Sequence, residues 1–255
     1  MKHNYHLLSY SGYPFMVFCS VMGLSSSLVI FLKYGVIFGV FFGVFCLFCV
    51  VMVWCKDIFM EGLSGYHNFF VMNGFKYGMV FFIFSEFMFF FGVFWVFFDS
   101  SLVPNSELGM SWCPLGIGLI NPLGVPLLNT LILLSSAVTV TWCHNSMLCN
   151  YNSFYGLFFT CVLALFFLVF QMLEYDESGF SMSDGIYGSI FYLSTGFHGM
   201  HVFFGMIFLF VNLFRLYMDH FNSDHHLGLE FSIVYWHFVD LIWLFLFVFV
   251  YWWSF

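Results

Sequence analysis

A carboxylate near the middle of a long apolar run constrains this chain more than any other feature of its sequence. Glu86 lies within Tyr77–Phe98, a 22-residue segment in which Ser85 is the only other hydroxyl or charged side chain after Tyr77. At about 1.5 Å of rise per residue, a helix of this length crosses the roughly 30 Å hydrocarbon core of a bilayer. A charged carboxylate at that depth costs about 2.5–3.5 kcal/mol, so we expect Glu86 to be neutral, hydrogen-bonded or turned toward protein. The segment predicts a membrane protein with a polar feature in its interior.

The composition excludes a surface that is water-solvated on all sides. Hydrophobic residues make up 62% of the 255 and charged residues only 7%, whereas a soluble domain usually carries about 25% charge. The net charge is −8 and the chain has only five Lys and Arg residues. It therefore lacks the basic surface that nucleic-acid-binding proteins use. We therefore expect no nucleic-acid partner.

Seven segments are long and apolar enough to cross a membrane, which predicts an all-α polytopic fold. The expected spans are Tyr13–Leu32, Gly35–Trp54, Tyr77–Phe98, Pro126–Leu148, Phe154–Leu173, Ile186–Leu216 and Phe231–Trp253. Of these, Pro126–Leu148 carries the most hydroxyl and amide side chains, and Ile186–Leu216 is long enough to require tilt or projection beyond the lipid.

The few cations predict the orientation of the spans. With seven spans, Lys2, Lys56, Lys76 and Arg215 fall on the side of the N-terminus, and Lys33 alone falls on the opposite side. Lys and Arg are enriched on the inner side of membrane proteins, so we expect the N-terminus in the cytoplasm or matrix. The first ten residues are polar and show no cleavable signal pattern.

The high phenylalanine content indicates the base composition of the gene. Phenylalanine alone contributes 43 residues, and its codons are rich in T. We infer a T-rich, strand-biased gene of the kind that organelle genomes carry.

The histidines are the candidates for a polar network or a cofactor. His198 and His201 are three residues apart and share one helix face, and His144 and His237 could reach a bundle interior from other helices. Asp240 follows His237 by three residues, so an acid–histidine hydrogen bond on neighbouring turns could form there. Haem needs axial ligands on both sides of an iron, and nothing in the spacing provides that geometry. Hydrogen-bonded packing histidines are therefore favoured, and a haem-binding membrane anchor is the alternative.

The eight cysteines do not form a metal-site pattern. Cys46 and Cys49 have the spacing of a redox motif, but they lie inside an apolar span, and the other six are scattered over different segments. A zinc site needs convergent ligands with matched spacing. We expect small apolar fillers and no metal site.

Polar and aromatic residues return between the second and third expected spans. Trp54, Lys56, Glu61 and His67 lie there, and such a set suits a phospholipid headgroup or an ordinary interfacial belt. Arg215, the only arginine, falls on the same side at the end of the sixth span. It is either an interfacial anchor or a lipid-binding residue.

An acidic group lies between the fifth and sixth expected spans, at Glu174–Glu177 and Asp184. It is typical of a solvated membrane edge, and the functional alternative is a docking or proton-collecting surface.

Three classes of membrane function remain to be weighed. A retinal protein needs a Schiff-base lysine, and the last span contains none. A self-contained or proton-conducting transporter would be expected to show repeats with broken helices, and none is evident. The third class, a subunit that packs against a catalytic partner, is favoured.

The order of motifs along nearly the whole chain resembles the cytochrome c oxidase subunit III family, of the mitochondrial type. The motifs that carry the resemblance are FKYGMVFFIFSE (75–86), FWVFFDSSLV (94–103), NPLGVPLLNT (121–130), SDGIYGS (183–189), TGFHGMHV (195–202), DHHLGLE (224–230), WHFVD (236–240) and the closing YWW (251–253).

The resemblance implies an accessory, non-redox core subunit of the terminal respiratory oxidase, which passes electrons from cytochrome c to oxygen and pumps protons. Haem and copper would belong to its partner subunits I and II, so this chain would have no catalytic residue, no metal and no haem of its own. It would stabilise the catalytic subunit, support proton supply and lie in the mitochondrial inner membrane with its N-terminus on the matrix side.

The family fold implies a two-helix pair and a five-helix bundle with phospholipids in the cleft between them. On this chain the pair would be residues 13–55, an inner-side polar connection 56–76, and the bundle 77–255. Glu86 matches the family's membrane-embedded acid, and Trp54, Glu61, His67 and Arg215 fall near positions that line lipid headgroups.

Three positions depart from the family pattern. Paired histidines are common where this chain has His67-Asn68 and His144-Asn145, and a basic residue is common where it has Met60. The departures at residues 60 and 68 lie beside the expected headgroup contacts.

Overall fold

The computed structural model describes residues 5–8, 10–104, 106, 109–114, 116–223 and 225–255. Lys2 and Asp224, which entered the orientation and motif arguments, lie outside these ranges. Within them the chain is helical, with no strand beyond an isolated bridge between Asn222 and His225.

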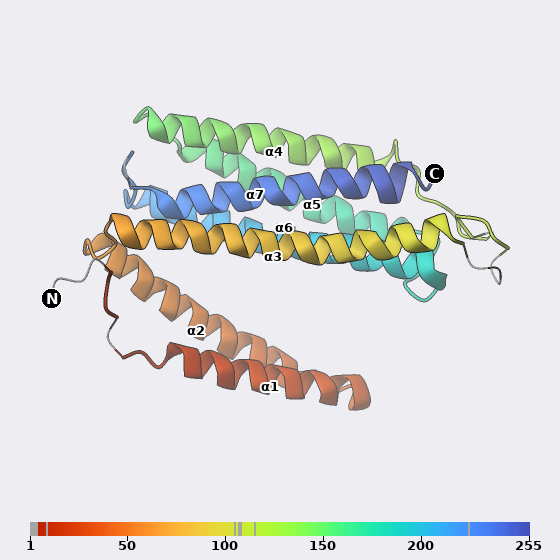
Figure 1. The fold of residues 1–255 in the computed structure, drawn as a ribbon, viewed down its shortest axis with the longest axis horizontal. Helices are drawn as coiled ribbons and strands as arrows, with labels where there is room; N and C mark the ends of the chain where they lie inside the picture. The colour runs from red at the N-terminus through yellow and green to blue at the C-terminus, as the bar shows by residue number, and fades with distance from the viewer. Residues whose placement is uncertain (1–4, 9, 105, 107–108, 115, 224) are drawn as a thin grey trace. The chain divides into compact units, whose positions relative to one another are not determined.

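Seven long helices run through the described residues (Figure 1). They are α1 (Tyr13–Tyr34), α2 (Phe38–Leu63), α3 (Phe69–Leu102), α4 (Val125–Leu148), α5 (Phe154–Glu177), α6 (Gly185–Tyr217) and α7 (Leu227–Leu246), which a π-helical segment, η2 (Phe247–Trp252), continues. Each is long and apolar enough to cross a membrane. The all-α, seven-span prediction is confirmed.

The connection between the second and third spans is shorter than the expected 56–76. Helix α2 continues to Leu63, and α3 already begins at Phe69. Gly65 adopts a left-handed φ of 82°, which a glycine tolerates without steric cost. Asn68 then accepts a hydrogen bond at 3.1 Å from the Val71 backbone N–H, as an N-terminal capping residue does. The departure at Asn68 thus has a local role in starting α3.

The contacts between residues divide the chain into two units, Met1–Tyr77 and Gly78–Phe255. In the first unit, α1 and α2 pack closely through glycines. A Cβ added at Gly43 would lie 2.9 Å from the Leu24 Cα, and one added at Gly39 would lie 2.7 Å from the Ser27 Oγ. The turn between the helices uses Gly35, whose φ is 72°. These small residues let two bulky, Phe-rich helices approach each other.

The second unit holds the core of the molecule. Helix α4 packs on α5 and α7, and α6 packs on α5 and α7, while α3 contacts α6 (Figure 1). Trp236 and Trp243 of α7 are fully buried at its centre. The Trp236 indole Nε1 donates a hydrogen bond of 2.8 Å to the Ser136 hydroxyl of α4, so a polar contact between helices reinforces the packing.

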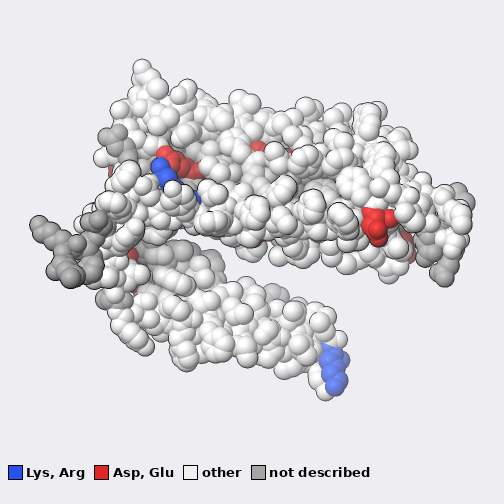
Figure 2. All heavy atoms as spheres, in the orientation of Figure 1, with Lys and Arg blue, Asp and Glu red and all other residues white. Residues whose placement is uncertain are grey.

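The outer surface of the helices is apolar. Figure 2 shows a face on which charged side chains occupy only a few places. The most apolar stretch of α1 has no residue buried within the chain. In α7 and its continuation η2, half of the corresponding stretch is buried. Because such surfaces are unstable in water, they must face lipid or another membrane protein.

Candidate functional site

The membrane-embedded acid has a histidine partner. Glu86, near the middle of α3, lies 2.8 Å from His201 of α6, measured from its Oε2 to the ring Nε2. The other ring nitrogen of His201, Nδ1, lies 2.6 Å from the backbone oxygen of Phe197. Of the three expected states of Glu86, neutral, hydrogen-bonded or turned toward protein, the structure shows the hydrogen-bonded one.

Hydrogen-bond chemistry limits this pair to a single shared proton. A carbonyl oxygen can only accept, so Nδ1 of His201 carries a hydrogen and donates it to Phe197. Either a protonated Glu86 then donates to a neutral His201, or an ionised Glu86 accepts from a protonated His201. Both arrangements have zero net charge, which suits a group at membrane depth.

Aromatic side chains surround the pair. The Phe90 ring packs edge-on against His201 with ring centres 5.1 Å apart. Phe89 of α3 packs in the same manner on Phe197 of α6, at 4.9 Å. These contacts fix α3 against α6 at the level of the acid. Glu86 nevertheless keeps a quarter of its side chain exposed on the surface of the isolated chain.

The five residues expected to form a polar network are not joined by hydrogen bonds in the described chain. His198 is fully buried against Phe167 and Trp243, and its Nε2 donates to the Val239 carbonyl at 3.2 Å. His201 uses both ring nitrogens, toward Glu86 and Phe197. This arrangement disfavours the haem-anchor hypothesis.

The expected hydrogen bond between His237 and Asp240 is wrong. Both carboxyl oxygens of Asp240 are buried without a hydrogen-bond partner among the described residues. Asp240 is only 6% exposed and faces the core, whereas His237 is only partly buried. Their three-residue spacing puts them on neighbouring turns of α7, but the Asp240 carboxyl group makes no hydrogen bond to His237.

His144 meets residues that the sequence argument did not assign to a site. It lies at the end of α4 beside His226, which precedes α7, and Glu230 of the first α7 turn. The nearest ligand atoms of these three residues all lie within 4.8 Å of one another. The four-residue spacing of His226 and Glu230 was the available sequence signal, since it puts both on one helix face.

The acidic residues at the end of α5 separate into two kinds. Asp176 and Glu177 are exposed, as a solvated edge requires, but Glu174 is only 2% exposed. Its Oε1 accepts a hydrogen bond of 2.5 Å from the Tyr251 hydroxyl in η2. Glu174 therefore ties the end of α5 to the C-terminal segment and is not part of the solvated edge.

The first unit gathers several of the proposed headgroup residues. Trp54 stacks on Tyr13 with ring centres 6.0 Å apart, and the Tyr13 hydroxyl hydrogen-bonds Asp57.

Glu61 lies 3.9 Å from the His6 ring Nε2. Lys56 is exposed, and the His67 ring lies over Gly62, so that a Cβ there would be 3.1 Å from its Nδ1. Aromatic, acidic and basic groups thus lie around the end of α2.

Arg215 belongs to the second unit, in the last turn of α6. Its guanidinium carbon lies 4.3 Å from the centre of the Phe221 ring, a cation–π contact. A Cβ at Gly228 would lie 2.5 Å from its Nη1, so the guanidinium packs directly on the start of α7. Its position at a helix C-terminus also favours a cation.

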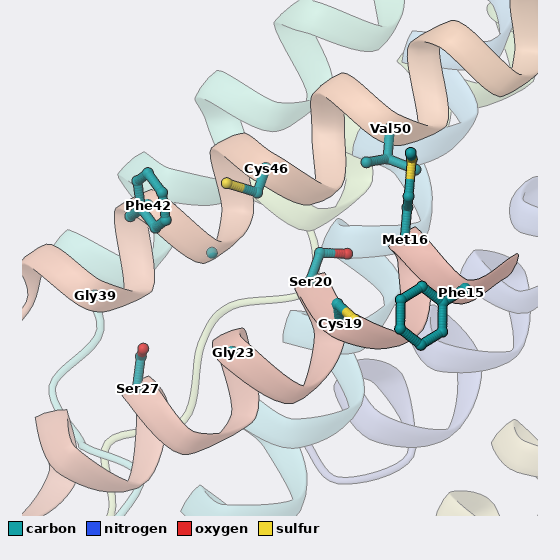
Figure 3. Close-up of a pocket in the computed structure, with 11 residues that line it drawn as sticks. Phe15, Met16, Cys19, Ser20, Gly23, Ser27, Gly39, Phe42, Cys46 and Val50 are labelled. Carbon is teal, nitrogen blue, oxygen red and sulfur yellow. The ribbon is translucent and has the colours of Figure 1, made fainter. Parts of the chain in front are cut away.

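An apolar groove opens between α1 and α2 (Figure 3). It has a volume of about 380 Å³. Gly23 and Phe15 of α1 and Gly39 and Phe42 of α2 are among the residues that line it. Both helices that line the groove are apolar enough to span a membrane.

Comparison with known proteins shows the family to which this chain belongs. A family profile described as cytochrome c oxidase subunit III matches residues 3–255. The chain belongs to the cytochrome c oxidase subunit III family. Membership makes it a subunit of the terminal oxidase, and the resemblance seen in the sequence is confirmed.

Curated relatives match nearly the whole length of this subunit. Cytochrome c oxidase subunit 3 of Struthio camelus is 45% identical over 255 residues, covering 99% of this chain and 98% of the relative. The Prototheca wickerhamii protein of the same name is 47% identical over 260 residues, with 99% and 98% covered. That of Mus musculus is 45% identical over 255 residues, with the same coverage. The subunit is a multi-pass membrane protein that belongs to the oxidase complex.

Proposed function

We propose that this subunit has an accessory, non-redox role and packs against subunits I and II of the oxidase, which would hold the haem and copper. The exposed apolar faces of its helices supply the surface for such packing. The observation that best supports this proposal is the Glu86–His201 pair, which has one shared proton and no net charge at mid-span. Such a pair suits proton handling more than electron transfer.

The pair would tune proton supply to the catalytic partner. We favour the form in which a neutral Glu86 donates to a neutral His201, because separated charges lose more hydration in hydrocarbon than neutral groups do. Part of the Glu86 side chain reaches the surface of the chain. The acid is thereby able to meet a partner subunit or a water there while its histidine holds it in place.

Replacing Glu86 tests the accessory role. In an assembled Glu86→Gln complex, infrared difference spectra should lose a protonated-carboxyl band. Oxygen reduction should fall by less than about tenfold, since an obligatory proton donor would contribute at least about 100-fold. Ser85→Ala is the matched control, because the Ser85 hydroxyl only donates to the Phe82 carbonyl of its own helix. Complete loss of oxygen reduction on Glu86→Gln would contradict the proposal.

We also propose that the subunit binds phospholipids as its non-protein components. In the first unit, Trp54, Lys56, Glu61 and His67 offer interfacial and hydrogen-bonding groups to headgroups. In the second unit, Arg215 offers a guanidinium fork able to hold a phosphate bidentately, a geometry that lysine cannot copy.

Substitution of Arg215 tests the lipid proposal. Arg215→Ala should lower the phospholipid retained by the purified complex and shorten its working life, while the initial turnover stays near normal. Arg215→Lys, which keeps the charge but not the fork, should retain an intermediate amount. Native mass spectrometry measures the lipid content. Unchanged lipid in Arg215→Ala would reduce this residue to an interfacial anchor.

The proposed location is the mitochondrial inner membrane with the N-terminus on the matrix side. Support comes from the T-rich codon preference and from the cations. Lys56, Lys76 and Arg215 fall on one side of a seven-span topology, and Lys33 falls on the other.

A further inference from the structure

We propose that His144, His226 and Glu230 form a divalent-cation site, of a chemistry that suits zinc, where α4 ends and α7 begins. The three residues come from two helices that pack together in the second unit. One ligand atom from each lies within 4.8 Å of the others. We had expected no metal site from the sequence, because these three residues come together only in the folded chain.

The two imidazoles present nitrogens that make no hydrogen bond within the described chain. Nε2 of His144 and Nε2 of His226 are both buried without a hydrogen-bond partner in the described chain. His226 is only 5% exposed, so bulk solvent barely reaches it. Buried polar atoms are normally hydrogen-bonded, so two such nitrogens beside one carboxylate call for an explanation.

The tautomer of His226 is the one that a metal ligand needs. Its Nδ1 lies 3.1 Å from the backbone oxygen of Asn222, which can only accept, so Nδ1 carries the hydrogen. In the neutral ring, Nε2 then has a free lone pair directed toward the cluster. Metal-bound histidines usually donate their second ring N–H to a carbonyl or carboxylate in this manner, which fixes ring and tautomer.

The donor set and its spacing indicate the class of ion. Two imidazoles and a carboxylate suit zinc and similar borderline divalent ions, whereas calcium and magnesium prefer oxygen alone. Nε2 of His226 already lies 3.4 Å from Oε1 of Glu230. Bonds of about 2.0–2.2 Å to a tetrahedral ion put ligand atoms about 3.4 Å apart, so binding would draw together three atoms that now lie within 4.8 Å of one another. Three protein ligands leave a fourth position for water.

A bound ion would join two helix ends. His144 lies in the last turn of α4, and His226 and Glu230 flank the start of α7, so the ion would link α4 to α7. The rings of His144 and His226 already lie with centres 5.8 Å apart. The alternative is a proton held among the three side chains with no ion.

Zinc counting on the assembled oxidase separates these readings. Purified complexes are equilibrated with ZnCl₂, desalted and analysed by inductively coupled plasma mass spectrometry. Wild type should retain one zinc per complex more than His226→Gln or His144→Gln, and metals elsewhere in the complex cancel in the difference. His225→Gln is the matched control, because His225 is the exposed neighbour and lies outside the cluster. It should bind zinc as wild type does.

A measurement on wild type alone keeps the proposal testable if the variants do not assemble. Cryo-electron microscopy maps of the complex with ZnCl₂ and with a chelator should differ by a density peak between the three side chains. Equal zinc in wild type and in both histidine variants would overturn the site, as would a wild-type difference map without that peak. Either result would leave the proton-holding cluster as the correct reading.

Discussion

At the scale of single residues, the fold changes the chemistry of groups whose sequence context is unremarkable in itself. Cys113 lies between α3 and α4, outside the spans. Its thiol donates to the Ser254 backbone oxygen at 3.0 Å, and the Trp112 indole lies 3.4 Å from the Ser254 hydroxyl. Burial, the main cause, raises the pKa of the Cys113 thiol. A segment distant in sequence thus makes this cysteine less reactive.

We predict a pH-dependent protection of Cys113 from alkylation. The thiolate is the nucleophile, and an ordinary thiol ionises near pH 8.5. Because the folded pKa is raised, less thiolate forms in the folded chain, and labelling between pH 8 and 9 should be slower than in the unfolded chain. For the same reason, folding stability should fall as pH rises above the unfolded pKa.

Maleimide labelling of the detergent-purified chain, followed by peptide mass spectrometry, measures the rates. Cys149 is the internal control, since it is exposed in the fold and should react at similar rates before and after unfolding. Equal rates for Cys113 in the folded and unfolded chains would show that the burial of its thiol does not govern its reactivity.

At the scale of helices, glycines decide which pairs approach closely. A Cβ at Gly156 of α5 would lie 2.9 Å from both the backbone nitrogen and the Cβ of Cys143 in α4. The contact involves backbone, so a side-chain rotation cannot relieve it. Gly92 of α3, by contrast, has nothing within 4 Å of the same position. The two glycines therefore have different structural roles, although both lie inside apolar helices.

We predict that Gly156→Ala destabilises the second unit by about 1–3 kcal/mol, the usual cost of overpacking. Gly92→Ala should be neutral or stabilising by up to about 1 kcal/mol, because alanine favours helix more than glycine does. Thermal unfolding of both variants in the same detergent gives the comparison. An unchanged midpoint for Gly156→Ala would mean that α4 and α5 separate at little cost.

At the scale of the whole molecule, seven spans place the two ends of each helix on opposite sides of a membrane. Lys33, in the last turn of α1, and Lys56, near the end of α2, are both exposed. One helix crossing separates them. They are therefore natural markers for orientation, and they belong to the same unit of the structure.

We predict that a membrane-impermeant acylating reagent labels Lys33 and not Lys56 in mitochondria whose outer membrane has been opened. Lys56 should become labelled only after the inner membrane is made permeable, because cations concentrate on the inner side. Peptide mass spectrometry identifies the modified lysine. The opposite order of labelling would place the N-terminus outside.

Much of the fold was predictable because membrane insertion depends on local composition. A helix in hydrocarbon satisfies its own backbone hydrogen bonds, so apolar length alone indicates a span. The expected spans accordingly match the seven observed helices, even for the hydroxyl-rich α4. Their ends were less predictable: α2 continues to Leu63 and ends just before a turn at Gly65, and Asn68 caps the start of α3.

The sequence by itself also determined that Glu86 should be neutral, hydrogen-bonded or turned toward protein, because an isolated charged carboxylate is costly at that depth. Only the tertiary structure decided that the partner is His201, 115 residues away, with His198 turned instead toward Val239. The tertiary structure also buries Glu174 in a hydrogen bond from Tyr251 and places the ring of His144 beside that of His226. Such contacts depend on how each helix is rotated and shifted against its neighbours. Those rotations follow from packing across the whole bundle, which no local pattern in the chain encodes.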